Sequence, residues 1–152
     1  MILRFLPAAL LASAASGSEP QLCPLRDDDA SCTRVLACVG DQGRWFHGRS
    51  LGRGAGDVVG VMSDGVACTG RWTERGVMGF GQADVTCDDG TRVEVIFTYQ
   101  DRYSGTATGR GLTEDGLAVQ VWSGQNVLGY LHQTTGAPTG TLPCAGAPML
   151  LS

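Results

Sequence analysis

The sequence predicts an all-β protein, in which an antiparallel meander of about eight strands closes into a small barrel or half-barrel stapled by disulfides. Spaced turns and alternating apolar residues lead to this prediction. Four tripeptides end in glycines that lie 22, 25 and 26 residues apart: Asp41-Gln42-Gly43, Ser63-Asp64-Gly65, Asp88-Asp89-Gly90 and Glu114-Asp115-Gly116. A three-residue hairpin loop needs a left-handed third residue, which suits glycine, and polar side chains earlier in the loop accept turn hydrogen bonds. We therefore expect a hairpin at each tripeptide.

Apolar residues alternate around these turns as three-residue loops require. Around Gly90 such a loop sets Val85 opposite Val93, whereas a two-residue loop would set Val85 against Glu94. The same parity holds around Gly65. One face of each hairpin should therefore be packed and the other wet. Because a single open layer would leave the apolar face in water, closure into a barrel is favoured.

Longer connections should alternate with the hairpin turns, at roughly 48–57, 73–79, 100–104 and 123–126. A last strand then runs to His132. Several glycines fall on the expected inner face, where they suit tight curvature or leave room for a ligand: Gly60, Gly70, Gly109, Gly111 and Gly129.

Four segments are expected along the chain. Residues 1–14 resemble a secretory signal, because Arg4 precedes a short apolar run and small residues stand at 12–14. The alternative is a buried N-terminal helix. An extension (15–33), the β-meander domain (34–132) and a C-terminal tail (133–152) follow. We expect a secreted or periplasmic protein without a transmembrane or lipid anchor, since the apolar run is far shorter than the ~20 residues of a membrane span.

Six cysteines in an exported chain indicate up to three disulfides. A zinc site is the alternative, but the sequence has no Cys-x-x-Cys motif, and we predict neither a metal nor a cofactor. If the connection after Trp72 is centred near residue 77 or 78, Cys68 lies directly opposite Cys87, within reach of a disulfide. Three connectivities remain for the other four cysteines, in which Cys144 pairs with one of the other three: Cys23, Cys32 and Cys38.

The run from Asp64 to Trp72, Asp-Gly-Val-Ala-Cys-Thr-Gly-Arg-Trp, continues to Gly79-Phe80-Gly81 and resembles a MORN repeat, with Cys68 in place of the repeat's tyrosine. The segment 103–116 is similar to a looser copy. This resemblance implies stacked β-hairpins and, as a class, scaffold or membrane-associated proteins. It implies no catalytic residue.

Composition excludes several activities. All eleven basic residues are arginine, so the phosphate-binding P-loop, the Ser-x-x-Lys nucleophile and a Schiff-base lysine are excluded. A net charge of −4 without a basic run argues against nucleic acid as the partner. The acidic turns should gather Asp64, Asp89 and Asp115 at one rim, where turn capping explains them and a weak calcium site is the alternative.

The sequence favours a non-catalytic exported module that binds a protein or envelope component. Its candidate residues are four arginines near the longer connections and two outer-face aromatics: Arg49, Arg53, Arg75, Arg102, Trp122 and Tyr130. The two aromatics either form an interface or are covered by residues 136–152. A structural envelope scaffold is the first alternative. A small periplasmic hydrolase that uses His47 or His132 is the second. The sequence predicts no oligomeric state.

Overall fold

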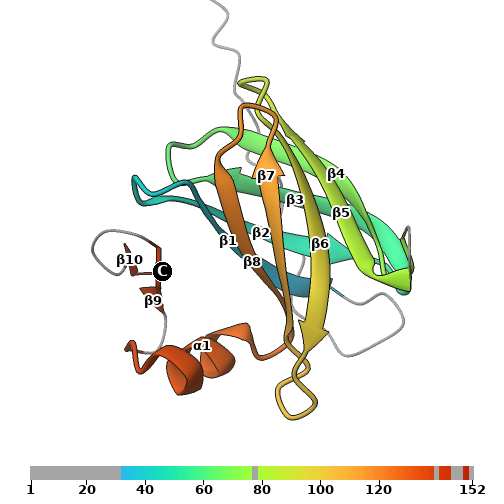
Figure 1. Cartoon of the computed structure of the whole chain (residues 1–152), viewed down its shortest axis with the longest axis vertical. Coiled ribbons are helices and arrows are strands. Elements are labelled where there is room, and N and C mark those ends of the chain that lie inside the picture. Colours follow the sequence, from blue (N-terminus) through green and yellow to red (C-terminus); the bar gives the residue numbers. More distant parts are fainter. Residues whose placement is uncertain (1–31, 77–78, 139–140, 145–148, 151–152) are drawn as a thin grey trace, which may run out of the picture.

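The computed structural model describes residues 32–76, 79–138, 141–144 and 149–150. Eight antiparallel strands form a closed barrel in sequence order, and the last strand pairs with the first (Figure 1). They are β1 (Cys32–Val39), β2 (Arg44–Leu51), β3 (Ala55–Met62), β4 (Ala67–Thr73), β5 (Gly81–Cys87), β6 (Arg92–Gln100), β7 (Ala107–Thr113) and β8 (Ala118–Gly124). The predicted meander is confirmed, and it closes fully.

Three of the four predicted three-residue turns are confirmed. In the β3–β4 turn, Met62 and Val66 pair through the Met62 N–H, which donates to the Val66 carbonyl, and Gly65 has φ +87°. Gly90 and Gly116 adopt the same left-handed conformation in the β5–β6 and β7–β8 turns. The first turn differs. Val39 pairs with Arg44, so its loop holds four residues, 40–43, rather than three.

Alternation divides the side chains as the sequence predicts. The interior cluster contains the inward residues of almost every strand: Val35, Ala37, Val39, Phe46, Val58, Met62, Cys68, Ala83, Cys87, Val95, Val119 and Val121. Charged and polar side chains of the intervening positions face outward, as Asp84 and Glu94 do where β5 pairs with β6. Burying this apolar set is the main stabilising contribution to the barrel.

The predicted strand ending at His132 is wrong, because residues 127–135 form a helix, α1 (Val127–Thr135). Val127 and Leu131 are one helical turn apart, and both are buried against the barrel wall. Gly129 therefore lies in the helix and not on the barrel's inner face. At its end, Gly136 adopts φ +68° and donates its N–H to the His132 carbonyl.

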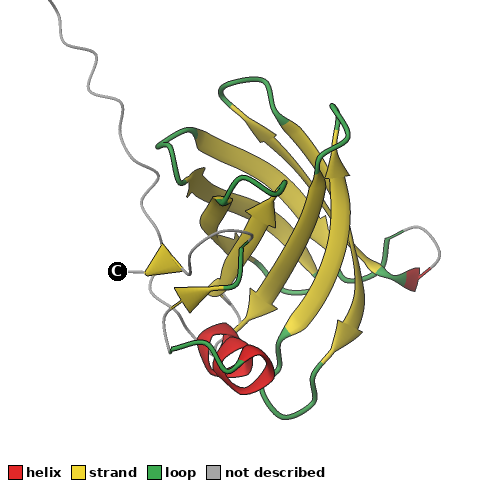
Figure 2. Cartoon of the chain, turned by 60° about the vertical axis from the view of Figure 1, so that its left-hand side comes forward, coloured by secondary structure: helices red, strands yellow, loops and turns green. Residues whose placement is uncertain are grey.

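A second apolar cluster lies outside the barrel, between the wall and the C-terminal segment. Leu36 and Trp122 project outward from β1 and β8, and α1 covers them together with Leu142 and Cys144. Figure 2 shows α1 against the outside of the wall, near the short strands β9 (Thr141–Leu142) and β10 (Met149–Leu150). Within the described residues, no helix combines the length and the apolar character needed to span a membrane.

Disulfides join elements inside and outside the barrel. Cys68 pairs directly with Cys87 across β4 and β5, and the two form a disulfide at the register that the sequence predicts. A second disulfide joins Cys38 to Cys144 and ties the tail to β1. Cys38 is therefore the partner of Cys144 among the three cysteines that the sequence left possible. Cys32 is also disulfide-bonded. Cys23 and the predicted signal segment lie outside the described residues.

Candidate functional site

A cavity of about 760 Å³ occupies the barrel interior. Its wall includes small and medium apolar side chains, among them Val58, Val85 and Val95, together with aromatic residues such as Phe46 and Phe97. Gly70 and Gly111 supply no side chain at positions that pair with Val85 and Val95. An eight-stranded barrel has an interior that side chains just fill or that holds one small ligand. Valine, alanine and glycine on the inward positions favour the second outcome here.

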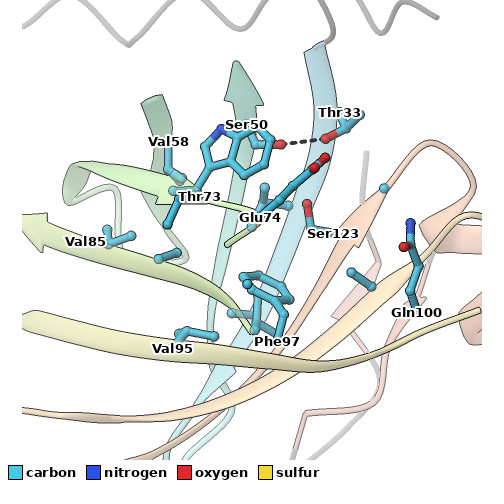
Figure 3. A pocket seen from close by; sticks show the side chains of 18 of the residues that line it. Thr33, Ser50, Val58, Thr73, Glu74, Val85, Val95, Phe97, Gln100 and Ser123 are labelled. Atoms are coloured by element: carbon cyan, nitrogen blue, oxygen red, sulfur yellow. Dashed lines mark hydrogen bonds between the residues drawn. The ribbon is translucent and has the colours of Figure 1, made fainter. Parts of the chain in front are cut away.

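The cavity opens at the end of the barrel that carries the longer connections. Its mouth is lined by hydroxyl groups and by one acid: Thr33, Ser50, Thr73, Ser123 and Glu74. Figure 3 shows these residues around the mouth, with Val85, Val95 and Phe97 farther along the wall. The hydroxyls of Thr33 and Ser50 hydrogen-bond to each other across β1 and β2. The site therefore combines an apolar body with a polar entrance, which is typical of small-molecule sites.

Trp72 and Glu74 are held in place at the mouth by backbone contacts. The indole Nε1 of Trp72 donates to the Leu51 carbonyl at 2.8 Å. The N–H of Glu74 donates to the Gly54 carbonyl at 2.7 Å, which continues the β3–β4 ladder one pair beyond Thr73. Strand alternation therefore places Glu74 on the side of Trp72, and Figure 3 shows its side chain turned into the mouth.

The opposite end of the barrel is the floor, where the acidic turns meet. Arg44 Nη2 lies 2.8 Å from the Asp89 carboxylate and 3.2 Å from that of Asp64. The backbone N–H of Thr91, and then Arg44, lower the pKa of Asp89 to about 2. Asp64 caps the turn through the Val66 N–H. These contacts confirm turn capping, and the described chain holds no group of three or more His, Cys, Asp or Glu side chains suited to a metal.

The predicted binding arginines are distributed over several places. Arg53 and Arg75 line the mouth, in the β2–β3 and β4–β5 connections. Arg102 is exposed in the β6–β7 connection. The expected connection at 48–57 is too long, because β2 runs to Leu51 and β3 begins at Ala55. Arg49 therefore lies within β2.

The outer side chains of β1 and β2 form a small positive cluster. His47 Nε2 lies 3.4 Å from Arg34 and 3.3 Å from Arg49. Burial, followed by the charges of Arg49 and Arg34, lowers the pKa of His47. His132 contacts the Ala137 carbonyl. In the described chain, neither histidine hydrogen-bonds to a serine, threonine or cysteine.

The two predicted outer aromatics take different positions. Trp122 is buried under α1 and the tail. Its outward position is therefore explained by this cover, and Trp122 does not form an exposed interface. Part of the cover is the helix, which precedes the expected segment 136–152. Tyr130 is half-buried on α1 rather than on a strand, so the parity argument does not apply to it. The structure therefore does not bring these aromatics together with the mouth arginines.

No protein-family model matches the chain, and no curated protein gives a significant sequence match. Solved structures with a similar fold include a redesigned β-barrel, mFAP0, bound to DFHBI, with 19% identity over 62% of this chain and 95% of that one, at a TM-score of 0.46. A second redesigned barrel, mFAP1, also bound to DFHBI, has 18% identity over 62% of this chain and 92% of that one, at a TM-score of 0.47. A fluorescence-activating β-barrel designed de novo has 18% identity over 69% of this chain and 94% of that one, at a TM-score of 0.48. This likeness concerns the barrel fold alone.

Proposed function

We propose that this chain is a non-catalytic binding protein that holds a small, mostly apolar ligand inside its barrel. The observation that carries the proposal is the interior cavity of about 760 Å³, with an apolar wall and a mouth at one end. This volume lies within the ~300–1,000 Å³ that small-molecule sites occupy. Removing an apolar ligand from water against such a wall is favourable.

The frame around the cavity supports this function because it is fixed before a ligand arrives. β1 pairs with β8, so the barrel is closed, and the Cys68–Cys87 disulfide cross-links its wall. Arg44 links the turns at the floor. A preformed site loses little conformational entropy when it binds, and this raises affinity.

Export to an oxidising compartment is part of the proposal. The disulfides Cys38–Cys144 and Cys68–Cys87 are typical of secreted and periplasmic proteins. The ligand would then be a molecule of the envelope or of the surroundings.

Recognition of a protein or envelope component through the mouth is the second candidate. Exposed aromatics stand on connections at this end, Phe80 before β5 and Tyr103 after β6, and Arg53 and Arg75 line the cavity at the same end. Arginine with aromatic side chains is typical of interface anchors. A scaffold role has less support, because every barrel strand of the described chain has both neighbours paired.

A fluorescent apolar probe tests the cavity directly. N-phenyl-1-naphthylamine is uncharged and brightens in apolar surroundings, so its titration measures occupancy of the barrel. Val85 is half-buried, lines the cavity and pairs with Gly70, so Val85→Phe should fill the space above that glycine. We expect about a tenfold loss of probe affinity or more, equivalent to ~1.4 kcal/mol.

Thr86→Phe is the matched control, since Thr86 follows Val85 on β5 and faces outward. It adds the same aromatic group outside the barrel and should leave probe affinity unchanged. Circular dichroism and thermal unfolding verify that both variants fold. Wild-type affinity in a folded Val85→Phe variant, or no binding by the wild-type protein, would overturn the proposal.

A further inference from the structure

The mouth of the cavity places a carboxylate beside aromatic rings. Glu74 is the one acidic residue among the described residues that line the cavity. The structure gives its carboxylate no ion pair with a described residue. Glu74 is exposed at the entrance of the cavity. Its charge is therefore available to a group that enters the mouth.

Five aromatic residues of the described chain line the same cavity: Phe46, Trp72, Phe80, Phe97 and Tyr99. Trp72 precedes Glu74 by two residues and faces the same side of the strand. Its indole is fixed by the hydrogen bond to the Leu51 carbonyl. Aromatic faces attract cations, most strongly when the ring is tryptophan.

The hydroxyl groups at the mouth add acceptors. Thr33, Ser50 and Ser123 line the entrance, and the oxygen of each hydroxyl group can accept hydrogen bonds while its O–H donates one. An ammonium group has N–H donors and no acceptor, so it matches a carboxylate flanked by hydroxyl oxygens.

Two arginines, Arg53 and Arg75, also line the cavity at this end. Arg53 already interacts within the protein. Arg75 lies beyond the end of β4, is exposed, and donates its backbone N–H to the Thr73 hydroxyl. The Glu74 carboxylate favours a cationic head and the guanidinium groups favour an anionic one, so the comparison of head groups described below decides between them.

We infer that the ligand has an apolar body with a positively charged ammonium head, which Glu74 and Trp72 receive at the mouth while the body occupies the barrel. This inference rests on the proposed function and adds the chemical class of the ligand. The cavity reaches from Thr33 to Val39 along β1, and six residues of strand advance roughly 20 Å. An extended ten-carbon chain fits within this depth.

Three probes with the same ten-carbon chain and different head groups separate the contribution of the head group to affinity from that of the apolar body. Decylammonium, decanol and decanoate are titrated calorimetrically into the full protein at pH 7. We expect decylammonium to bind about tenfold more tightly than decanoate, with decanol between them. Added salt should reduce the difference, because the mouth is solvated.

Glu74→Gln removes the charge and keeps the shape. It should weaken decylammonium by about threefold or more and leave decanol within about twofold. Glu114→Gln is the matched control, because Glu114 is exposed in the β7–β8 turn at the opposite end of the barrel. It should change neither affinity.

The outcomes separate the two proposals. Equal binding of the three probes overturns the ammonium inference and leaves the apolar-ligand function in place. Tighter binding of decanoate also overturns it and assigns the head to Arg53 or Arg75. Failure of all three probes, together with failure of the naphthylamine probe, overturns both.

Discussion

Arg44 and Asp89 are 45 residues apart in the chain, and their side chains meet 2.8 Å apart at the floor of the barrel. Arg44 is the first residue of β2, and Asp89 is the central residue of the β5–β6 turn. Asp64, in the β3–β4 turn, contacts the same guanidinium. One cation therefore connects turns that backbone pairing alone does not join. These contacts hold the floor together, at the end of the barrel opposite the mouth of the cavity.

Asp89→Asn should change how the protein responds to acid. The Thr91 N–H and Arg44 lower the pKa of Asp89 to about 2 in the folded chain. A lowered pKa means that the folded state favours the carboxylate, so the stabilisation is present above about pH 4 and is lost as the pH falls towards 2. We expect the variant to have a lower melting temperature at pH 7 and a smaller further decrease between pH 4 and 2.

Melting temperatures measured from pH 7 to pH 2 check this prediction. Asp88→Asn is the control, because the neighbouring Asp88 is exposed and its side chain makes no contact with Arg44. Parallel profiles for Asp89→Asn and the wild-type protein would contradict the prediction.

The barrel could be predicted because turn chemistry and side-chain parity are local. Gly65, Gly90 and Gly116 mark the turns, and each turn fixes which residues face each other across its hairpin. The Cys68–Cys87 pairing followed from the same parity. The first turn differs from the predicted three-residue loop because Gly40 also adopts a left-handed conformation and belongs to the loop.

Other features depend on packing that one sequence does not specify. The apolar run from Val127 to Leu131 is too short for periodicity to separate a strand from a helix. The partner of Cys144 depends on where the tail crosses the barrel. The inward glycines indicated room for a ligand, but an open cavity depends on the barrel's diameter. Parity extended past Trp72 would have placed Glu74 inward.

Leu131→Ala should weaken the attachment of α1 to the barrel. Leu131 is 1% exposed and packs in the outer cluster with Leu36 and Trp122. Removing a buried leucine side chain costs about 2–5 kcal/mol, so we expect a loss of about 3 kcal/mol in the free energy of unfolding. Urea unfolding measures the loss, and a red shift of tryptophan emission reports that Trp122 has become wetter.

Gln133→Ala is the control on the same helix, since Gln133 is exposed and the change should stay within about 0.5 kcal/mol. If Leu131→Ala has an equally small effect, the helix does not pack on the wall as described.

Removing the Cys38–Cys144 disulfide should destabilise the protein and loosen its tail. The bond closes a sequence separation of 106 residues. In the chain-entropy model a loop of this size contributes about 4 to 5 kcal/mol, because the cross-link restricts the unfolded chain. We expect the Cys38→Ala, Cys144→Ala double variant to lose about this much free energy of unfolding. Denaturant unfolding measures it, and a loss below about 1 kcal/mol would show that the tail is held by packing alone.

Gly111→Ala should be more destabilising than a glycine substitution in a turn. A Cβ at Gly111 would lie 1.9 Å from the Glu94 carbonyl oxygen, so β6 and β7 would have to separate. We expect a loss of about 2–3 kcal/mol, the upper part of the range for overpacking. At Gly65 a Cβ meets no atom within 4 Å, so Gly65→Ala bears only the cost of its φ of +87°, about 1 kcal/mol. Urea unfolding of the two variants gives the comparison. An equal or smaller loss for Gly111→Ala would mean that β6 and β7 lie farther apart at this position than their pairing requires, and that the barrel is wider there.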